Sequence, residues 1–400
     1  MSIIAARLNR IKPSPSSMAS QRARELRAAG RDIIGLTSGE PDFDTPPNVG
    51  EAVVRAMAAS KTKYTDVGGT PELKAAVIEK FRRDNALTYA SNEVIVGAGG
   101  KQIIFNALMS TLEPGDEVIV PAPYWVSYPD IALLAEGRPL VVTCRAEDGF
   151  KLRPETLDRA ITLKTRWLVL NAPNNPSGAT YTRDELRALA DVLLRHPHVW
   201  IMSDDIYEHI LYDGRRFFTI AQVEPALKER TLTINGVSKA YAMTGWRIGY
   251  GGAPAELVKA MTKLQSQSTS NACSISQAAA QEALTGPQDF IAERARIFKT
   301  RRDKVVAAVN RIPGLRCHAP EGAFYIYASC ADVIGKTTPD GQVIGSDADF
   351  VMYLLESQNL ALLQGEAYGL SPFVRISFAT SMQTLEEGCR RLRLACEALR

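Results

Sequence analysis

One stretch of the chain decides the fold: RWLVLNAPNNPSGATYTRDELRALADVLLRHPHVWIMSDD, residues 166–205. It opens with an apolar run that ends in a turn of Asn, Pro and Gly, and it closes with a second apolar run that ends in two acids. The segment between them starts with Thr182 and Glu185 at capping-box spacing. Its apolar residues fall on one helix face: Leu186, Leu189, Ala190 and Leu193. The stretch therefore predicts a strand, a helix and a second strand.

The same alternation continues on both sides of this unit. EVIVGAG (93–99), DEVIVPAP (116–123) and TLTINGVSK (231–239) are apolar runs that end in turns, and KQIIFNALMSTL (101–112) is a predicted helix. Continuous apolar strands separated by helices indicate a mostly parallel sheet that is covered on both faces. Ligands of such sheets bind beyond the carboxyl ends of the strands.

Toward the end of the chain the pattern changes. GAFYIYA (322–328), DADFVMYLLESQ (347–358) and FVRISFA (373–379) mix short strands with a helix, which is typical of a smaller α+β domain. We expect a large domain over residues 48–290, and a small domain made of residues 1–47 together with 291–400.

Composition excludes several classes of function. The 400 residues carry 47 basic and 44 acidic side chains, a net charge of only +3, which argues against nucleic acid or an anionic membrane as partner. No apolar run is long enough to span a bilayer, and the first residues lack the apolar core of a signal peptide, so we expect a cytoplasmic protein. The six cysteines and four histidines show no CxxC, HExxH or mixed cluster, which predicts reduced thiols and no metal site.

VSKAYAMTGWRIGY (237–250) places Lys239 among small and apolar residues, with Arg247 eight positions further on. A lysine amine becomes a nucleophile when a desolvated or cation-flanked pocket lowers its pKa. The planar guanidinium of Arg247 matches a phosphate or a carboxylate. The alternative is an exposed loop lysine beside an unrelated arginine, and this stretch alone would favour that alternative.

Polar residues also follow the predicted strands. Asp204 ends one of them in SDDIYEH, where a buried acid needs a cation such as a pyridinium nitrogen, and Tyr207 could reach the same ring. Asn175, in APNNPSG, could donate its amide to a ligand oxygen. A helix cap, a core aromatic and ordinary turn chemistry are the structural alternatives.

Two further stretches suggest anion binding. GAGGK (97–101) joins a strand to a helix, so Gly99 and Gly100 would let a phosphate approach the helix N-terminus. It lacks the full Walker and GxGxxG patterns. Arg375, inside the apolar run SPFVRISFA, needs an anionic partner, either a substrate carboxylate or an internal salt bridge.

Taken together, eight stretches resemble, in order, the motifs of class I pyridoxal-phosphate aminotransferases of fold type I. They are SGEPDFDTP, KYTDVGGTPELK, GAGGKQ, PAPYWVSYP, NAPNNPSG, SDDIYEH, SKAYAMTGWRIGY and VRISFAT. The resemblance covers most of the chain and is strongest to bacterial aspartate aminotransferases, some of which also accept prephenate. It implies an α/β fold with pyridoxal phosphate as cofactor, small amino acids and 2-oxo acids as substrates, and a homodimer with active sites shared across the interface.

The resemblance also implies roles for particular residues toward the cofactor. Lys239 would attach it covalently and move the substrate proton, while Arg247 would hold its phosphate. Asp204 would pair with the pyridine nitrogen, and Tyr207 and Asn175 would contact the ring hydroxyl oxygen. Trp125 would stack on the cofactor ring. The phosphate end would be lined by Gly99, Gly100 and Lys101, and Tyr64 of the neighbouring subunit would reach the phosphate.

For the substrate, the resemblance implies an α-carboxylate site at Arg375, helped by Gly39 and Asn175. Lys101 and Lys12 are the candidates for a distal carboxylate, since no counterpart of the arginine that other subgroups use is found. One departure is Gly236, where many relatives have a phosphate-binding serine; Ser238 is a possible substitute.

The resulting prediction is an aminotransferase that moves an amino group between L-aspartate, or a relative such as glutamate, and a 2-oxo acid, with prephenate as a further possible acceptor. A C–S lyase or an aromatic-amino-acid aminotransferase would share the same cofactor site. A non-catalytic sensor of this fold would need a DNA-binding helix-turn-helix, for which the first 30 residues are too short.

Overall fold

The computed structural model describes residues 3–13 and 15–400. Its main sheet has seven strands in the order β2-β8-β7-β6-β5-β3-β4. The strands are β2 Val94–Gly97, β3 Glu117–Ala122, β4 Arg138–Thr143, β5 Thr165–Asn171, β6 Trp200–Asp204, β7 Thr231–Gly236 and β8 Gly249–Gly252. Neighbouring strands are parallel except for β8, which is antiparallel to both β2 and β7. The predicted mostly parallel sheet is confirmed.

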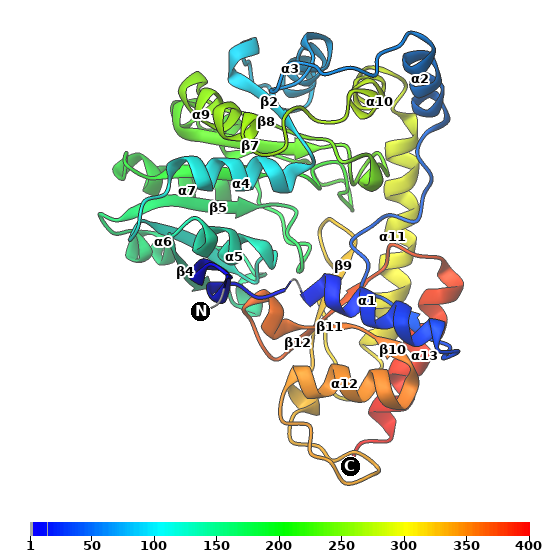
Figure 1. Ribbon diagram of the computed structural model, residues 1–400. Helices are drawn as coiled ribbons and strands as arrows, with labels where there is room; N and C mark the ends of the chain where they lie inside the picture. The colour runs from blue at the N-terminus through cyan, green and yellow to red at the C-terminus, as the bar shows by residue number, and fades with distance from the viewer. Residues whose placement is uncertain (1–2, 14) are drawn as a thin grey trace.

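Helices cover both faces of this sheet, as Figure 1 shows. The helices of the described chain, not all of which contact this sheet, are α1 Pro15–Ala28, α2 Pro47–Ala58, α3 Pro71–Asn85, α4 Gly100–Thr111, α5 Ser127–Leu134, α6 Pro154–Ala160, α7 Arg183–Arg195, α8 Ile220–Val223, α9 Ala255–Ser266, α10 Ser274–Thr285, α11 Asp289–Val309, α12 Asp347–Gln358 and α13 Met382–Glu397. Within β5, Trp167 and Val169 belong to the core shared with α4, α5 and α9, whereas Leu168 and Leu170 belong to the core shared with α6 and α7. This alternation explains why residues 167–170 of the strand are all apolar.

The unit that decided the fold is β5, α7 and β6. Thr182 caps α7 as expected: its side chain accepts from the Glu185 backbone N–H at 3.2 Å, and the Glu185 carboxylate accepts from the Thr182 N–H at 2.7 Å. Strands β5 and β6 are parallel, with Asn171 opposite Asp204 in register. Their carboxyl ends therefore meet at one edge of the sheet.

A second group of strands lies below the main sheet in Figure 1. Strands β11 Leu363–Gln364, β12 Phe373–Ser377 and β9 Tyr325–Ser329 form an antiparallel sheet in that order, and β1 Ile34–Gly35 pairs with β10 Leu360–Ala361. Their apolar side chains share a core with α11, α12 and α13. The early chain thus pairs with the late chain, as the proposed small domain requires, while the boundaries near residues 47 and 290 stay a prediction. Within the described residues, no helix is both long and apolar enough to cross a membrane.

Candidate active site

A cavity of about 200 Å³ opens at the carboxyl ends of β5, β6 and β7. Most of the residues predicted from the sequence line it: Gly39, Gly100, Lys101, Trp125, Asn175, Asp204, Tyr207, Lys239, Arg247 and Arg375. The strand register explains why these residues lie together. Asp204 at the end of β6 lies opposite Asn171 at the end of β5, and on its other side it lies opposite Ile234, which is two residues before the end of β7. Lys239 lies three residues after that end. The topology thus brings together groups that are up to 336 positions apart, from Gly39 to Arg375.

Lys239 lies half-buried in the cavity wall, where its Nζ donates to the backbone oxygen of Gly39 at 2.7 Å. Burial, followed by the positive charges of Arg247 and Arg375, lowers the pKa of Lys239 to about 8. Such an amine is partly neutral near pH 7, as a nucleophile or a proton acceptor must be. The alternative of an exposed loop lysine is wrong.

Asp204 is buried at the end of β6, 6% exposed. Its Oδ2 accepts from the hydroxyl of Tyr128 at 2.5 Å, and its Oδ1 accepts from the Ile206 N–H at 3.4 Å. Burial raises the pKa of Asp204 to about 6, against the opposing effects of these hydrogen bonds and Lys239. Its neighbour Asp205 instead accepts from Ser203 Oγ at 2.7 Å and is not part of the cavity lining. The acid that faces a ligand is therefore Asp204.

Arg375 is 2% exposed on β12, and its guanidinium meets neutral oxygens. Nη1 donates to Asn175 Oδ1 at 3.0 Å and Nη2 donates to the Thr37 carbonyl at 2.6 Å, while Nε has no hydrogen-bond partner in the described part of the chain. The ring of Tyr325 lies 4.4 Å from the guanidinium carbon. Among the described residues no carboxylate forms an ion pair with Arg375, so the alternative of an internal salt bridge is wrong. A buried cation of this kind requires an anion from outside.

Tyr207 links the main sheet to the second group of strands. Its hydroxyl lies 2.8 Å from that of Tyr325, which is on β9, and both rings are buried. Asn171 completes the network, because its amide donates to the Asp204 carbonyl at 2.9 Å and its Oδ1 accepts from the Asn175 N–H at 3.0 Å. The polar groups of the cavity are therefore held in fixed relative positions.

The far end of the cavity combines a helix N-terminus with a guanidinium. Gly99 has φ +88°, and a Cβ built on it would lie 2.3 Å from Arg247 Nη2, so only glycine fits there. Arg247 donates to the Thr244 carbonyl at 2.9 Å and to the Ala98 carbonyl at 3.3 Å. Gly100 starts α4 and lines the cavity, whereas Gly99 precedes α4 in the turn and is not part of the cavity lining. This end suits a phosphate.

The structure gives a steric reason for the departure at Gly236. A Cβ at this position would lie 2.9 Å from the Ile248 carbonyl oxygen and 3.1 Å from the Gly249 Cα. Because β8 passes this close, a serine would force the backbone apart. Ser238 is buried and lines the cavity, so it stays the candidate substitute for the missing hydroxyl.

Besides Gly99, two predicted residues lie outside the cavity lining. Tyr64 is 91% exposed, and Lys12 is exposed with its backbone N–H donating to the Asp130 carboxylate at the start of α5. Conversely, Tyr128, Asn171 and Tyr325 line the cavity without having been predicted. The only sequence signal for Tyr128 was its position three residues after Trp125.

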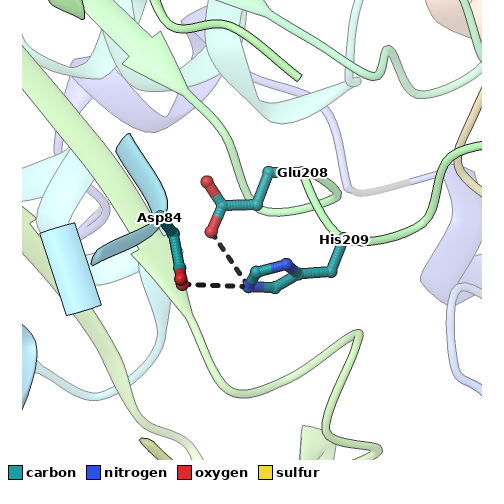
Figure 2. A group of neighbouring side chains, drawn as sticks. All are labelled: Asp84, Glu208 and His209. Carbon is teal, nitrogen blue, oxygen red and sulfur yellow. Dashed lines mark ion pairs between the residues drawn. The ribbon is translucent and has the colours of Figure 1, made fainter. Parts of the chain in front are cut away.

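A second polar cluster lies outside the cavity lining. Figure 2 shows His209 Nε2 between Glu208 and Asp84, at 3.2 Å and 3.5 Å. Lys80, which is fully buried, forms an ion pair with Glu208, lies 3.9 Å from Asp84, and donates to Asn85 at 2.7 Å. Since Lys80 pairs with Glu208 and Arg83 pairs with Asp84, with Nε 2.7 Å from Oδ1, the cluster is an ion-pair network that joins α3 to the segment after Tyr207.

The cavity fits pyridoxal phosphate by the chemistry of its donors. A primary amine suits the aldehyde, a buried carboxylate suits the pyridine nitrogen, and a helix N-terminus with a guanidinium suits the phosphate. Nε of Arg375, which has no hydrogen-bond partner among the described residues, can still bind an anion in this cavity. Fold and site together define an enzyme that works on amino groups through this cofactor.

Comparison with known proteins agrees. The sequence profile of the family Aminotransferase class I and II matches residues 31–392. The chain is 55% identical to "Probable aspartate/prephenate aminotransferase" of Rhizobium leguminosarum bv. phaseoli, with 100% of both chains covered. It is 56% identical to "Aspartate/prephenate aminotransferase" of Cereibacter sphaeroides, again with 100% of both covered.

Solved structures give the same result. The aspartate aminotransferase from Rhizobium meliloti superimposes with a TM-score of 0.97 at 54% identity, covering 100% of both chains. The aspartate aminotransferase from Thermus thermophilus with maleate superimposes with a TM-score of 0.92 at 41% identity, covering 99% of this chain and 100% of the other. The chain belongs to the class I and II aminotransferase family and is a pyridoxal-phosphate-dependent transaminase of fold type I.

Proposed function

We propose that this transaminase moves the amino group of L-aspartate, or of a related dicarboxylic amino acid such as glutamate, to a 2-oxo acid such as 2-oxoglutarate or oxaloacetate. The observation that carries the proposal is Arg375, a buried guanidinium without a carboxylate partner that lines the same cavity as the low-pKa Lys239. The amino acid's α-carboxylate would bind Arg375 and Asn175 beside Gly39. The names of the relatives support a dicarboxylic substrate.

The remaining cavity residues would hold the cofactor. Pyridoxal phosphate supplies an electron sink for the electron pair that is freed when a bond to the substrate Cα breaks. Asp204 would pair with its ring nitrogen, and Trp125 would stack on the ring. Tyr207 and Asn175 would contact the ring hydroxyl oxygen, and Arg247 with Gly99, Gly100 and Lys101 would bind the phosphate.

Lys239 would act twice. Its amine would hold the resting cofactor and, once an incoming amino acid has displaced it, would accept the proton from the substrate Cα. The pKa of about 8 suits both tasks, because the amine is basic enough to take the proton and is not fully protonated at neutral pH. Lys239 would then return that proton on the cofactor side, water would hydrolyse the remaining bond to release the 2-oxo acid, and a second 2-oxo acid would take the amino group by the same steps in reverse, as a ping-pong cycle.

The distal carboxylate of a dicarboxylic substrate would bind to Lys101, with Lys12 as a second candidate. Lys101 Nζ lies 4.8 Å from the centre of the Trp125 ring, and its pKa is lowered by burial and by Arg247. Lys12 is exposed near α5, outside the cavity lining, and interacts with Asp130, which also interacts with Lys101. Prephenate, which combines two carboxylates with a ring, is an additional acceptor that we propose on the names of the relatives.

We propose further that the working unit is a cytoplasmic homodimer. Tyr64 is 91% exposed and would reach the phosphate of the neighbouring subunit. Ile3, Ile4, Val54 and Met57 are also exposed apolar side chains that a second copy could cover. All six cysteines are unpaired thiols, which fits a reducing compartment.

A substrate screen tests the proposal. Holoenzyme is incubated with aspartate, glutamate, aromatic, branched-chain and sulfur amino acids against several 2-oxo acids and prephenate, and all products are identified. We expect matched pairs of a new amino acid and a new 2-oxo acid, with aspartate and glutamate the best donors. Release of ammonia and pyruvate from sulfur amino acids would instead identify a lyase, and a preference for aromatic donors would overturn the dicarboxylate assignment.

A further inference from the structure

Tyr128, on α5, touches the proposed partner of the cofactor ring. Its side chain is 2% exposed and lines the cavity, and its hydroxyl donates to Asp204 Oδ2 at 2.5 Å. The Trp125 ring packs edge-on against it, with centroids 5.2 Å apart and an interplanar angle of 80°. The tyrosine therefore sits between the residue that would stack on the ring and the acid that would face its nitrogen.

The hydrogen bond from Tyr128 makes the two carboxylate oxygens of Asp204 different from each other. Oδ2 is occupied by Tyr128, whereas Oδ1 has only a long contact of 3.4 Å with the Ile206 N–H. Oδ1 is the oxygen with remaining capacity for a ligand. The direction of the bond is settled because burial, and then the nearby Asp204, raise the pKa of Tyr128 well above its ordinary value, so the hydroxyl keeps its proton.

The charge of Asp204 is under competing influences. Burial favours the neutral acid, while the Tyr128 hydroxyl, the Ile206 N–H and the Lys239 ammonium favour the carboxylate, and the balance is a pKa of about 6. Only the carboxylate can pair with a protonated pyridine nitrogen. Removing the hydroxyl removes the largest of the three opposing influences, so Asp204 would become neutral at a higher pH.

We propose that Tyr128 is a positioning residue of the amino-transfer site: its hydroxyl keeps the Asp204 carboxylate ionised and leaves Oδ1 directed to the cofactor nitrogen. The inference rests on the proposed role of Asp204 and gives a role to a tyrosine of the stretch PAPYWVSYP to which the resemblance assigned none. It also explains why a tyrosine three residues after Trp125 is buried with its hydroxyl against an acid.

The test uses the full-length apoenzyme and pyridoxamine 5′-phosphate, which has no aldehyde and cannot bond to Lys239. Its dissociation constant is measured by tryptophan fluorescence at closely spaced pH values from about 5 to about 8.5. For the wild type we expect affinity to fall as the pH drops through the pKa of Asp204, about 6. For Tyr128→Phe the midpoint should move up by about one pH unit, which weakens binding about fivefold at pH 6.

The control variant is Tyr181→Phe. Tyr181 is also buried, but its hydroxyl accepts from the Leu152 N–H at 2.9 Å, away from Asp204, so its loss should leave the midpoint unchanged. Protein containing 3-fluorotyrosine gives a measurement without loss of the hydroxyl. Its hydroxyls donate more strongly, so the midpoint should move below that of the unlabelled protein.

Asp204→Asn separates the two claims. If this variant loses the pH midpoint while Tyr128→Phe and the fluorinated protein keep the wild-type value, the inference about Tyr128 is overturned and the role of Asp204 stands. If Asp204→Asn itself keeps the midpoint and the affinity, the proposed role of Asp204 fails. A midpoint that shifts in Tyr128→Phe, and not in Tyr181→Phe, supports the inference even if both variants lose some stability.

Discussion

At the scale of single residues, the cavity depends on buried cations that form no ion pair with a carboxylate in the described part of the chain. Arg375 is the clearest case, since its guanidinium is held by Asn175 and the Thr37 carbonyl and packs on the Tyr325 ring. Neutral oxygens orient the group without cancelling its charge. The site therefore keeps a place for the carboxylate of an amino acid.

Replacing Arg375 with alanine should remove the binding site for the substrate α-carboxylate while leaving the cofactor bound. We expect kcat/KM for aspartate to fall about 10²- to 10³-fold, because a buried, hydrogen-bonded charge pair with the substrate is lost. Steady-state kinetics give the fall, and the visible absorbance of the bound cofactor provides the control. An unchanged kcat/KM would show that the α-carboxylate binds elsewhere.

Lys239 carries a cost in stability that follows from its pKa. Its value of about 8 in the folded chain is depressed below the ordinary lysine value, so the folded state resists protonation between about pH 8 and pH 10.5. The penalty is fully present below pH 8 and vanishes as the pH rises through the unfolded value. Replacing Lys239 with methionine should therefore stabilise the apoenzyme at pH 7 by roughly 1–3 kcal/mol, with a smaller gain above pH 9.

Urea unfolding of both apoproteins across this pH range measures the effect. A gain that does not depend on pH would point to packing and would contradict the electrostatic explanation. The same variant should bind pyridoxal phosphate without the absorbance change that its attachment to an amine produces.

At the scale of elements, the segment from β6 into Tyr207 is fastened to α3 by the cluster of Figure 2 together with Lys80. Glu208 is buried, so removing its cation leaves an uncompensated charge. We expect Lys80→Met to destabilise the protein by about 3–5 kcal/mol. The double variant with Glu208→Gln should recover much of that loss, as the free energies of unfolding in urea would reveal. Equal losses in the single and double variants would contradict this.

The approach of β8 to β7 makes a second prediction at this scale. Gly236→Ser should destabilise the protein by about 1–3 kcal/mol, because a Cβ there meets the Ile248 carbonyl at 2.9 Å. The added hydroxyl should not tighten cofactor binding. Titration of the apoenzyme with pyridoxal phosphate checks the second point, and tighter binding in the variant would show that the strand can move aside.

The sequence predicted those parts of the structure that local pattern controls. The unit 166–205 was predicted from its apolar runs and its capping box, and Lys239, Asp204 and Arg375 stood out because each is a charge in an apolar setting. Tyr128 and Tyr325 could not be found in this way, since an aromatic residue in an apolar segment is indistinguishable from core until its hydroxyl meets a partner. The reason for Gly236 depends on the path of β8, which no local pattern contains.

At the scale of the whole molecule, the exposed Tyr64 is best explained by a second copy. Mixed dimers of Tyr64→Ala and Lys239→Ala subunits contain one site with both native residues. We expect such hybrids, separated by different tags, to bind pyridoxal phosphate about tenfold more tightly at that site than the Tyr64→Ala homodimer does. We expect sedimentation velocity to show a dimer. Hybrid affinity equal to that of the Tyr64→Ala homodimer would contradict a shared site.

The most direct test of the central claim follows the nitrogen atom. Holoenzyme is given ¹⁵N-aspartate and 2-oxoglutarate, and mass spectrometry measures the label in glutamate and in ammonia. Transamination through Lys239 predicts one labelled glutamate for each oxaloacetate formed, with no labelled ammonia, and no sustained turnover in Lys239→Ala. Label that appears in ammonia, or full transfer by Lys239→Ala, would contradict the account.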